Sequence, residues 1–238
     1  MPNSFTDILI GSQLAEYRIK QFLTKKQFID NALNCNVSLK ISCNPAIFLQ
    51  LLEKIKLVQN GFRCYFVKDL DQDHDELSVI FSVVGPTQGN IDLYYKLSVD
   101  DNELRQLTCR DVWINWVPGV VPFLAASSKT QPPHGETKSI YYEAKDIDQL
   151  ITVFKSGVQY INICFAAYNT AGNTVATPDD AEYINQLALI FELITKDPFH
   201  GKSKFYFGFG RRLLTGSSYA DTGVPCPPPP TGSQCPGA

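Results

Sequence analysis

The chain has 238 residues, 44% of them hydrophobic and 12% aromatic, which is enough for one large domain or two intimately joined halves. Its net charge is -3, and lysine and arginine are scattered among the acids, so nucleic acid is not an expected partner. The first residues lack the pattern of a secretory signal, and no run is apolar over the roughly 18 residues that span a bilayer. We therefore expect a cytoplasmic protein without a membrane partner.

The first elements in chain order are predicted to be a helix, a strand, a second helix and three strands. Residues 11–33 have the apolar spacing of one helix, or of two helices with a break near Thr24. The alternation at 37–41 precedes Asn44-Pro45, a helix start whose proline takes the one helical position that tolerates it. Asn60-Gly61 should end that helix. A hairpin and a third strand are then predicted over 62–70, 76–85 and 91–99.

From Lys138 the same order returns. Residues 139–144 predict a strand, the apolar face from Ile147 to Phe154 predicts a helix that stops at Gly157, and 158–168 predicts another strand. Residues 37–70 and 139–168 thus have the pattern of two related strand-helix-strand units.

Beyond this match the second half is predicted to diverge. Thr177-Pro178-Asp179-Asp180 has the composition of a helix start. The spacing of a buried helical face follows, at Ile184, Leu187, Ala188, Phe191 and Ile194. A final strand is predicted over 204–210.

These elements predict an α+β fold in which an antiparallel or mixed sheet packs against helices, with two related strand-helix-strand halves. The predicted divisions are an N-terminal helical segment (1–36), a first α+β half with the hairpin and a Trp/Pro segment (37–126), a linker (127–137), a second α+β half (138–214) and a Pro/Cys-rich tail (215–238).

An acidic run at the predicted hairpin tip is one candidate metal site. Its alternating carboxylates, which are hard oxygen ligands of the kind that calcium prefers, are Asp69, Asp71, Asp73 and Asp75. A calcium loop would need glycine where His74 stands and glutamate where Ile80 stands. A solvated hairpin tip explains the same charges, so metal binding is the lesser hypothesis.

The sequence contains no recognised catalytic motif. The three histidines, His74, His134 and His200, lie in polar loops flanked by Pro or Gly or among charges. The alternative to a non-enzymatic role is an enzyme of unrecognised type with a cleft between the halves, near His200, Arg211 and Arg212. We expect no cofactor. Five cysteines are dispersed without a C-x-x-C pair and are predicted to be buried free thiols: Cys35, Cys43, Cys64, Cys109 and Cys164.

Two segments favour binding over catalysis. Trp113, Trp116 and Phe123 lie in a stretch interrupted by proline and glycine, and aromatic side chains of this kind dominate protein–protein contacts when exposed. Cys226 and Cys235 flank a proline run that suits a stiff peptide ligand, a small disulfide loop or an intermolecular thiol pair, with plain disorder as the alternative. We therefore predict a non-enzymatic binding or self-assembling structural protein, a homo-oligomer or one bound to a protein partner.

The strand Gly61 to Phe66 that follows an apolar helix, together with the ending Asp221 to Pro228, resembles a group of small Bacteroidota proteins that end in a Cys-Pro-Pro-x-Cys tail. In this chain the second cysteine, Cys235, lies nine residues beyond Cys226, which departs from that pattern. The resemblance implies a lineage and carries over no functional residue.

Overall fold

The computed structural model describes residues 10–33, 37–57, 61–69, 76–84, 90–98, 103–108, 139–155, 157–169, 183–197 and 201–208. The elements in these ranges are α1 (Ser12–Leu33), β1 (Lys40–Cys43), α2 (Pro45–Lys56), β2 (Gly61–Asp69), β3 (Glu76–Val84), β4 (Asn90–Ser98), β5 (Glu103–Leu107), β6 (Ser139–Glu143), α4 (Ala144–Lys155), β7 (Val158–Ala167), β8 (Leu187–Asp197) and β9 (Gly201–Gly208). The predicted α+β class is confirmed.

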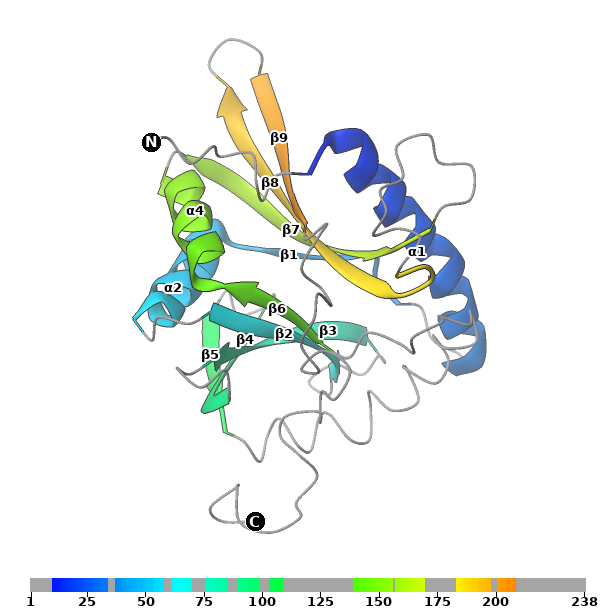
Figure 1. Ribbon diagram of the computed structural model, residues 1–238, viewed down its shortest axis with the longest axis horizontal. Coiled ribbons are helices and arrows are strands. Elements are labelled where there is room, and N and C mark those ends of the chain that lie inside the picture. The colour runs from blue at the N-terminus through cyan, green and yellow to red at the C-terminus, as the bar shows by residue number, and fades with distance from the viewer. Residues whose placement is uncertain are drawn as a thin grey trace.

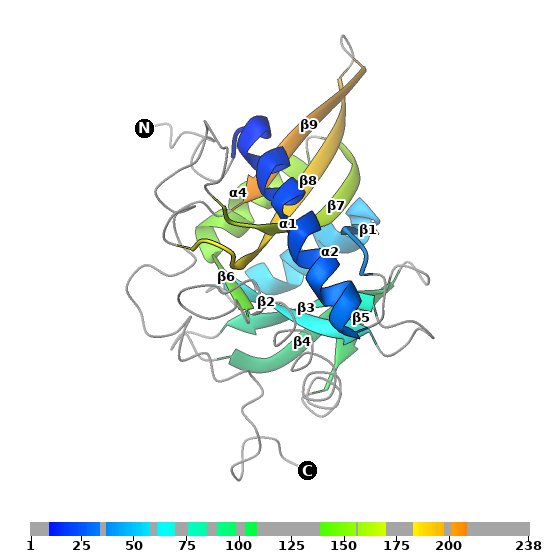
Figure 2. The ribbon, with the colours of Figure 1, turned by 90° about the vertical axis from the view of Figure 1, so that its right-hand side faces the viewer.

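The strands form two antiparallel sheets that face each other (Figure 1). Sheet A has the order β1-β7-β8-β9, and sheet B has the order β5-β4-β3-β2-β6. Helices α2 and α4 pack together at one open side of this pair of sheets, and α1 runs along the outside of sheet A (Figures 1 and 2). In the described part of the chain, none of these helices is long and apolar enough to cross a membrane.

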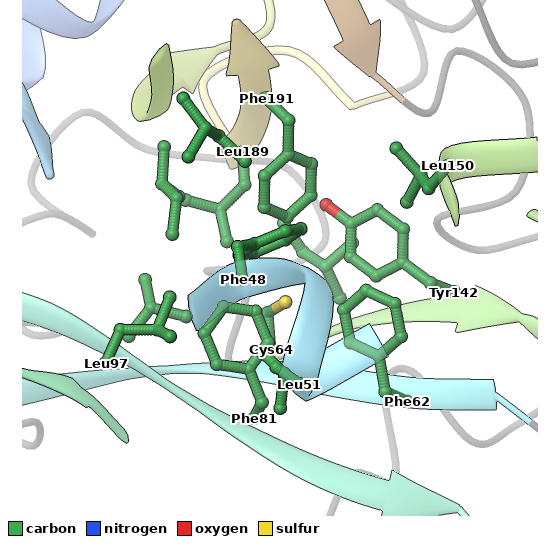
Figure 3. Close-up of a cluster of buried hydrophobic side chains, with 14 of the residues drawn as sticks. Phe48, Leu51, Phe62, Cys64, Phe81, Leu97, Tyr142, Leu150, Leu189 and Phe191 are labelled. Carbon is green, nitrogen blue, oxygen red and sulfur yellow. The ribbon is translucent and has the colours of Figure 1, made fainter. Parts of the chain in front are cut away.

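The main core lies between the two sheets and the α2–α4 pair. Phe48 of α2 packs between Phe81 of sheet B and Phe191 of sheet A, with ring centroids 5.9 and 5.4 Å away (Figure 3). Phe66 and Phe165 bring the two sheets into direct contact at 6.2 Å. Large aromatic side chains therefore fill the space where the sheets approach each other.

The first helix is continuous, without the break considered near Thr24. Its buried side chains follow a spacing of three and four residues that continues on both sides of that position: Ala15, Arg18, Phe22, Lys25 and Ile29. Two of these five are cationic. The Arg18 guanidinium lies 4.5 Å from the centre of the Tyr168 ring, an arrangement that suits a buried cation.

The start of α2 follows its predicted chemistry. The Asn44 side chain accepts a hydrogen bond from the Ala46 amide at 2.8 Å, and Pro45 occupies the first turn. Gly61, the first residue of β2, and Gly157, which precedes β7, both have positive φ, at 118° and 107°. Glycine adopts this conformation without steric cost, which explains both predicted stops.

A shift of 99 residues relates the two helices of the core. It carries residue 45 onto 144 and residue 56 onto 155, so α2 and α4 coincide over their whole 12-residue length. The buried face of α2, formed by Phe48, Leu51, Leu52 and Ile55, falls on Ile147, Leu150, Ile151 and Phe154, which are also buried. The two halves therefore use the same helical face with different side chains.

The same shift relates the strand pairings. Strand β1 pairs with β7 so that Lys40 lies opposite Cys164, and the shift converts this pair into Ser139 opposite Tyr65, which is the observed pairing of β6 with β2. Each half thus contributes its first strand to the sheet built mainly by the other half. The halves are interlocked and do not form two separate sheets.

The equivalence between the two halves also includes β3 and β8, which the sequence pattern did not predict. Residues 187–197 form strand β8, so the prediction of a helix over this part was wrong. Alternate residues of β3 and β8 face the same core and differ by 110 in number, as Phe81 and Phe191 do: Leu77, Val79, Phe81 and Val83 in one, Leu187, Leu189, Phe191 and Leu193 in the other. Because β8 is buried on both faces, its apolar run, interrupted only by Glu192 between residues 187 and 194, contains a helical spacing by coincidence.

Candidate functional site

A row of polar side chains crosses the outer face of sheet A, the face that α1 partly covers. Ser42 of β1 lies opposite Asn162 of β7, Asn162 lies opposite Glu192 of β8, and Glu192 lies opposite Tyr206 of β9. One polar residue from each of the four strands therefore lies in a single line, because cross-strand partners share a face of the sheet. We call these four residues the polar row.

Glu192 is the acceptor at the centre of the row. One carboxylate oxygen accepts a hydrogen bond from the Asn162 amide, whose own oxygen accepts from the Ser42 hydroxyl at 2.7 Å. The other oxygen lies 3.0 Å from the Lys204 ammonium and 3.4 Å from the Tyr206 hydroxyl. The Tyr206 hydroxyl also lies 3.1 Å from a carboxylate oxygen of Glu16, so the network reaches α1. A buried carboxylate is tolerated here because it is paired and hydrogen-bonded.

The charge state of the row follows from these contacts. Burial would raise the pKa of the Glu192 carboxyl, but the hydrogen bonds from Asn162 and Lys204 and the positive charges of Lys204 and Lys40 hold that pKa below its ordinary value of 4.5. The hydrogen bond to Glu192 correspondingly raises the pKa of Lys204. Burial, followed by the hydrogen bond to Glu16, raises the pKa of Tyr206. At neutral pH the row holds a fixed ion pair and has no group suited to exchange protons.

We expect Glu192→Gln to destabilise the protein by about 1–3 kcal/mol at pH 7, because one donor that now faces a carboxylate oxygen would face an amide nitrogen. Since the folded-state pKa of Glu192 is lowered, its stabilising contribution is complete above pH 4.5 and is lost as the pH falls through the folded-state pKa. Urea unfolding of the variant and the wild type between pH 3 and 8 checks this. If the free energies of unfolding of the wild type and the variant differed by the same amount at every pH from 3 to 8, the assigned role of the Glu192 carboxylate would be contradicted.

A second, more exposed line of side chains borders the polar row. Tyr160 lies opposite Ile194, and Ile194 lies opposite Lys204. Tyr160 is 54% exposed, the Lys204 side chain is also 54% exposed, and Ile194 is half-buried. Lys40 and Ser42 on β1 are exposed on the same face. We call Lys40, Ser42, Tyr160, Ile194 and Lys204 the outer patch of sheet A.

The three cysteines in the described part of the chain are free thiols, as predicted for them. Cys64 and Cys164 are buried, and Cys43 is partly buried. Burial raises the pKa of Cys43 and of Cys164 to about 12 and raises that of Cys64 well above its ordinary value. A nucleophilic cysteine needs a thiolate at neutral pH, so these thiols serve packing.

Most residues singled out from the sequence lie outside the described part of the chain. These are the aromatic candidates Trp113, Trp116 and Phe123, the tail cysteines Cys226 and Cys235, the ligand candidates His200, Arg211 and Arg212, and the acids Asp71, Asp73 and Asp75. Asp69 is the last residue of β2. Among the described residues there is no group of three or more His, Cys, Asp or Glu side chains placed to hold a metal ion.

The polar row was missed by sequence reasoning. Its signal is slight: Asn162 interrupts the apolar run of 161–167, and Glu192 is the single charge between Leu187 and Ile194. An isolated polar residue in a buried strand needs a hydrogen-bond partner. A hydrogen bond between Asn162 and Glu192 could therefore have been predicted from the sequence.

Comparison of the chain with family models, with curated proteins and with solved structures gave no match. The likeness to Bacteroidota proteins with a Cys-Pro-Pro-x-Cys tail therefore stays a prediction.

Proposed function

We propose that this is a non-enzymatic, self-assembling protein whose chains associate through the outer patch of sheet A. The observation that carries the proposal is Tyr160, an aromatic side chain 54% exposed on a strand of the sheet. Tyrosine is enriched among the residues that dominate protein–protein binding, because it buries a large area and loses little conformational entropy.

Two features of the surroundings support this role. The half-buried Ile194 lies directly beside Tyr160 and extends the apolar part of the patch. Lys204 is held by Glu192, so its ammonium loses less freedom on contact with a partner than a freely rotating lysine would. The exposed Lys40 adds positive charge, which complements a chain whose net charge is -3.

The oligomeric state tests this proposal. Size-exclusion chromatography with light scattering, over a concentration series of the full chain, is expected to give a mass above that of the monomer. Tyr160→Ala is expected to raise the dissociation constant of the assembly about 30-fold or more. Phe28→Ala is a matched control, because Phe28 is an aromatic side chain 45% exposed on α1.

Two results would contradict this proposal. One is a strict monomer at high concentration. The other is an assembly that Phe28→Ala weakens and Tyr160→Ala does not, which would show that the chains contact each other through α1 and not through sheet A.

A further inference from the structure

The two halves of the chain meet across an approximate two-fold axis. The shift of 99 residues carries Phe66 onto Phe165, and these two equivalent residues contact each other, with ring centroids 6.2 Å apart. Residues that contact their own equivalents lie on the axis of a symmetric interface, as in a homodimer with two-fold symmetry. The axis therefore passes between Phe66 and Phe165, where the two sheets approach each other.

Strand contacts away from this axis occur twice, once on each side of it. Phe62 of β2 lies opposite Tyr142 of β6, and the two rings are stacked with centroids 4.6 Å apart (Figure 3). The shift carries these residues onto Ile161 and Cys43, which are also an observed pair, between β7 and β1. Each half therefore presents the same surface to the other half that it receives from it.

The two core helices follow the same rule. The Phe48 ring of α2 stacks on the Phe154 ring of α4, with centroids 5.3 Å apart. The shift turns this pair into Ile147 and Ile55, which are both buried in the same core. Each half thus gives one strand and one apolar helix face and receives the same in return. Reciprocal exchange of a strand between equivalent units is the architecture of a domain-swapped dimer, here joined into one chain.

The connection between the halves does not determine which second half a given first half meets. Strand β5 ends at Leu107 and β6 begins at Ser139. A chain of this length reaches about 100 Å when fully extended. Halves from two different chains make the same contacts as the halves of one chain, so the two arrangements differ mainly in the entropy of bringing two chains together.

We propose that the surface between the halves is a second site of self-association, at which the first half of one chain pairs with the second half of another copy, and the reverse. The exchanged dimer keeps the β1–β7 and β2–β6 ladders and leaves no core exposed. Halves joined by a flexible connection have an effective concentration on the order of millimolar, so exchange competes when chains fold at similar concentrations. Tyr160 takes no part, so this site is independent of the outer patch.

Complementation between two full-length variants tests the exchange. Phe48→Asp places a charge in the core from the first half, and Leu150→Asp does so from the second half, so each variant alone is expected to be unfolded. When the two are mixed and refolded from urea, the intact second half of one and the intact first half of the other should form one native pair. We expect the mixture to recover a cooperative urea transition whose midpoint rises with concentration.

A matched mixture controls for general association. Phe48→Asp with Leu51→Asp places both charges in the first half, so no intact first half is present and no transition is expected. All variants carry Tyr160→Ala, so that the outer patch does not hold the chains together. Failure of the complementary mixture to refold would overturn the proposal. Refolding of the matched mixture would also overturn it, because second halves would then pair with each other.

The Tyr160→Ala chain without a core charge gives a second measurement, which decides the question if a charged variant folds by itself. Refolded at about 1 mM and diluted to about 1 µM, it should contain a dimer by light scattering. This dimer should persist for hours, because return to the monomer requires the halves to separate. A dimer held by the outer patch of the wild type would dissociate on dilution. Monomer alone after refolding would overturn the exchange and leave the outer patch proposal unaffected.

Discussion

Replacing Phe48 by alanine is expected to lower the free energy of unfolding by about 3–5 kcal/mol, because the cavity opens at the centre of the fold. The Phe48 ring is fully buried and packs against Phe81, Phe154 and Phe191, with centroid distances between 5.3 and 5.9 Å. These three rings come from sheet B, from α4 and from sheet A. Each of the three rings is also packed against its own sheet or helix, so none of them can move far into the cavity left by Phe48, and the surrounding structure can relax only slightly.

Urea unfolding followed by circular dichroism measures this loss. Leu57→Ala is the matched control, because Leu57 directly follows the same helix and is 82% exposed, and its replacement should change the free energy by less than about 0.5 kcal/mol. A loss below about 1.5 kcal/mol for Phe48→Ala would mean that the two sheets do not depend on this helix for their packing.

Cutting the chain between its halves is expected to leave them together. A protease site inserted into the predicted linker 127–137 would separate the part that contains β1–β5 from the part that contains β6–β9. The β1–β7 and β2–β6 ladders, with four and five residue pairs, join the two parts across both sheets. Separation would also expose the core that both halves line, so the contact has the character of an obligate interface.

Chromatography of the cut protein should therefore give one peak with both fragments, down to about 0.1 µM. In a Tyr160→Ala background, where the proposed self-association is weakened, the urea midpoint of the cut protein should depend on concentration because folding has become bimolecular, and that of the uncut chain should not. Ile140→Asp is a useful companion variant, since Ile140 is buried on β6 opposite Cys64, and it should release the fragments after cutting. Two independent peaks from the cut wild type would show that the halves are separable domains.

The sequence by itself determined the elements whose signals are local. Helix α2 follows from a cap, a proline and an apolar spacing within twelve residues, and α4 follows from its apolar face and Gly157. The β2–β3 hairpin follows from β-branched and aromatic residues on both sides of an acidic turn. Helix α2 buries one face, so its periodicity and its structure agree. Strands β2 and β3 are buried on both faces, so their composition and the turn between them gave the signal.

Strands β8 and β5 mark the limit of local signals. Residues 187–194 are apolar at seven of eight positions, and such a run satisfies a helical spacing and a strand equally. Its partners β7 and β9 make it a strand, because they bury both of its faces and satisfy its backbone groups. Strand β5 is short and mostly exposed, so its sequence contains little apolar pattern to detect.

Only the tertiary structure decided how the two halves interlock and where the polar row lies. Ser42, Asn162, Glu192 and Tyr206 are far apart in the chain, and their alignment depends on the register of three ladders. A slip of one residue would turn Glu192 toward the apolar core. The sequence determined which strands and helices can form, and the burial of alternate residues from both halves in one core fixed the register that brings the polar residues together.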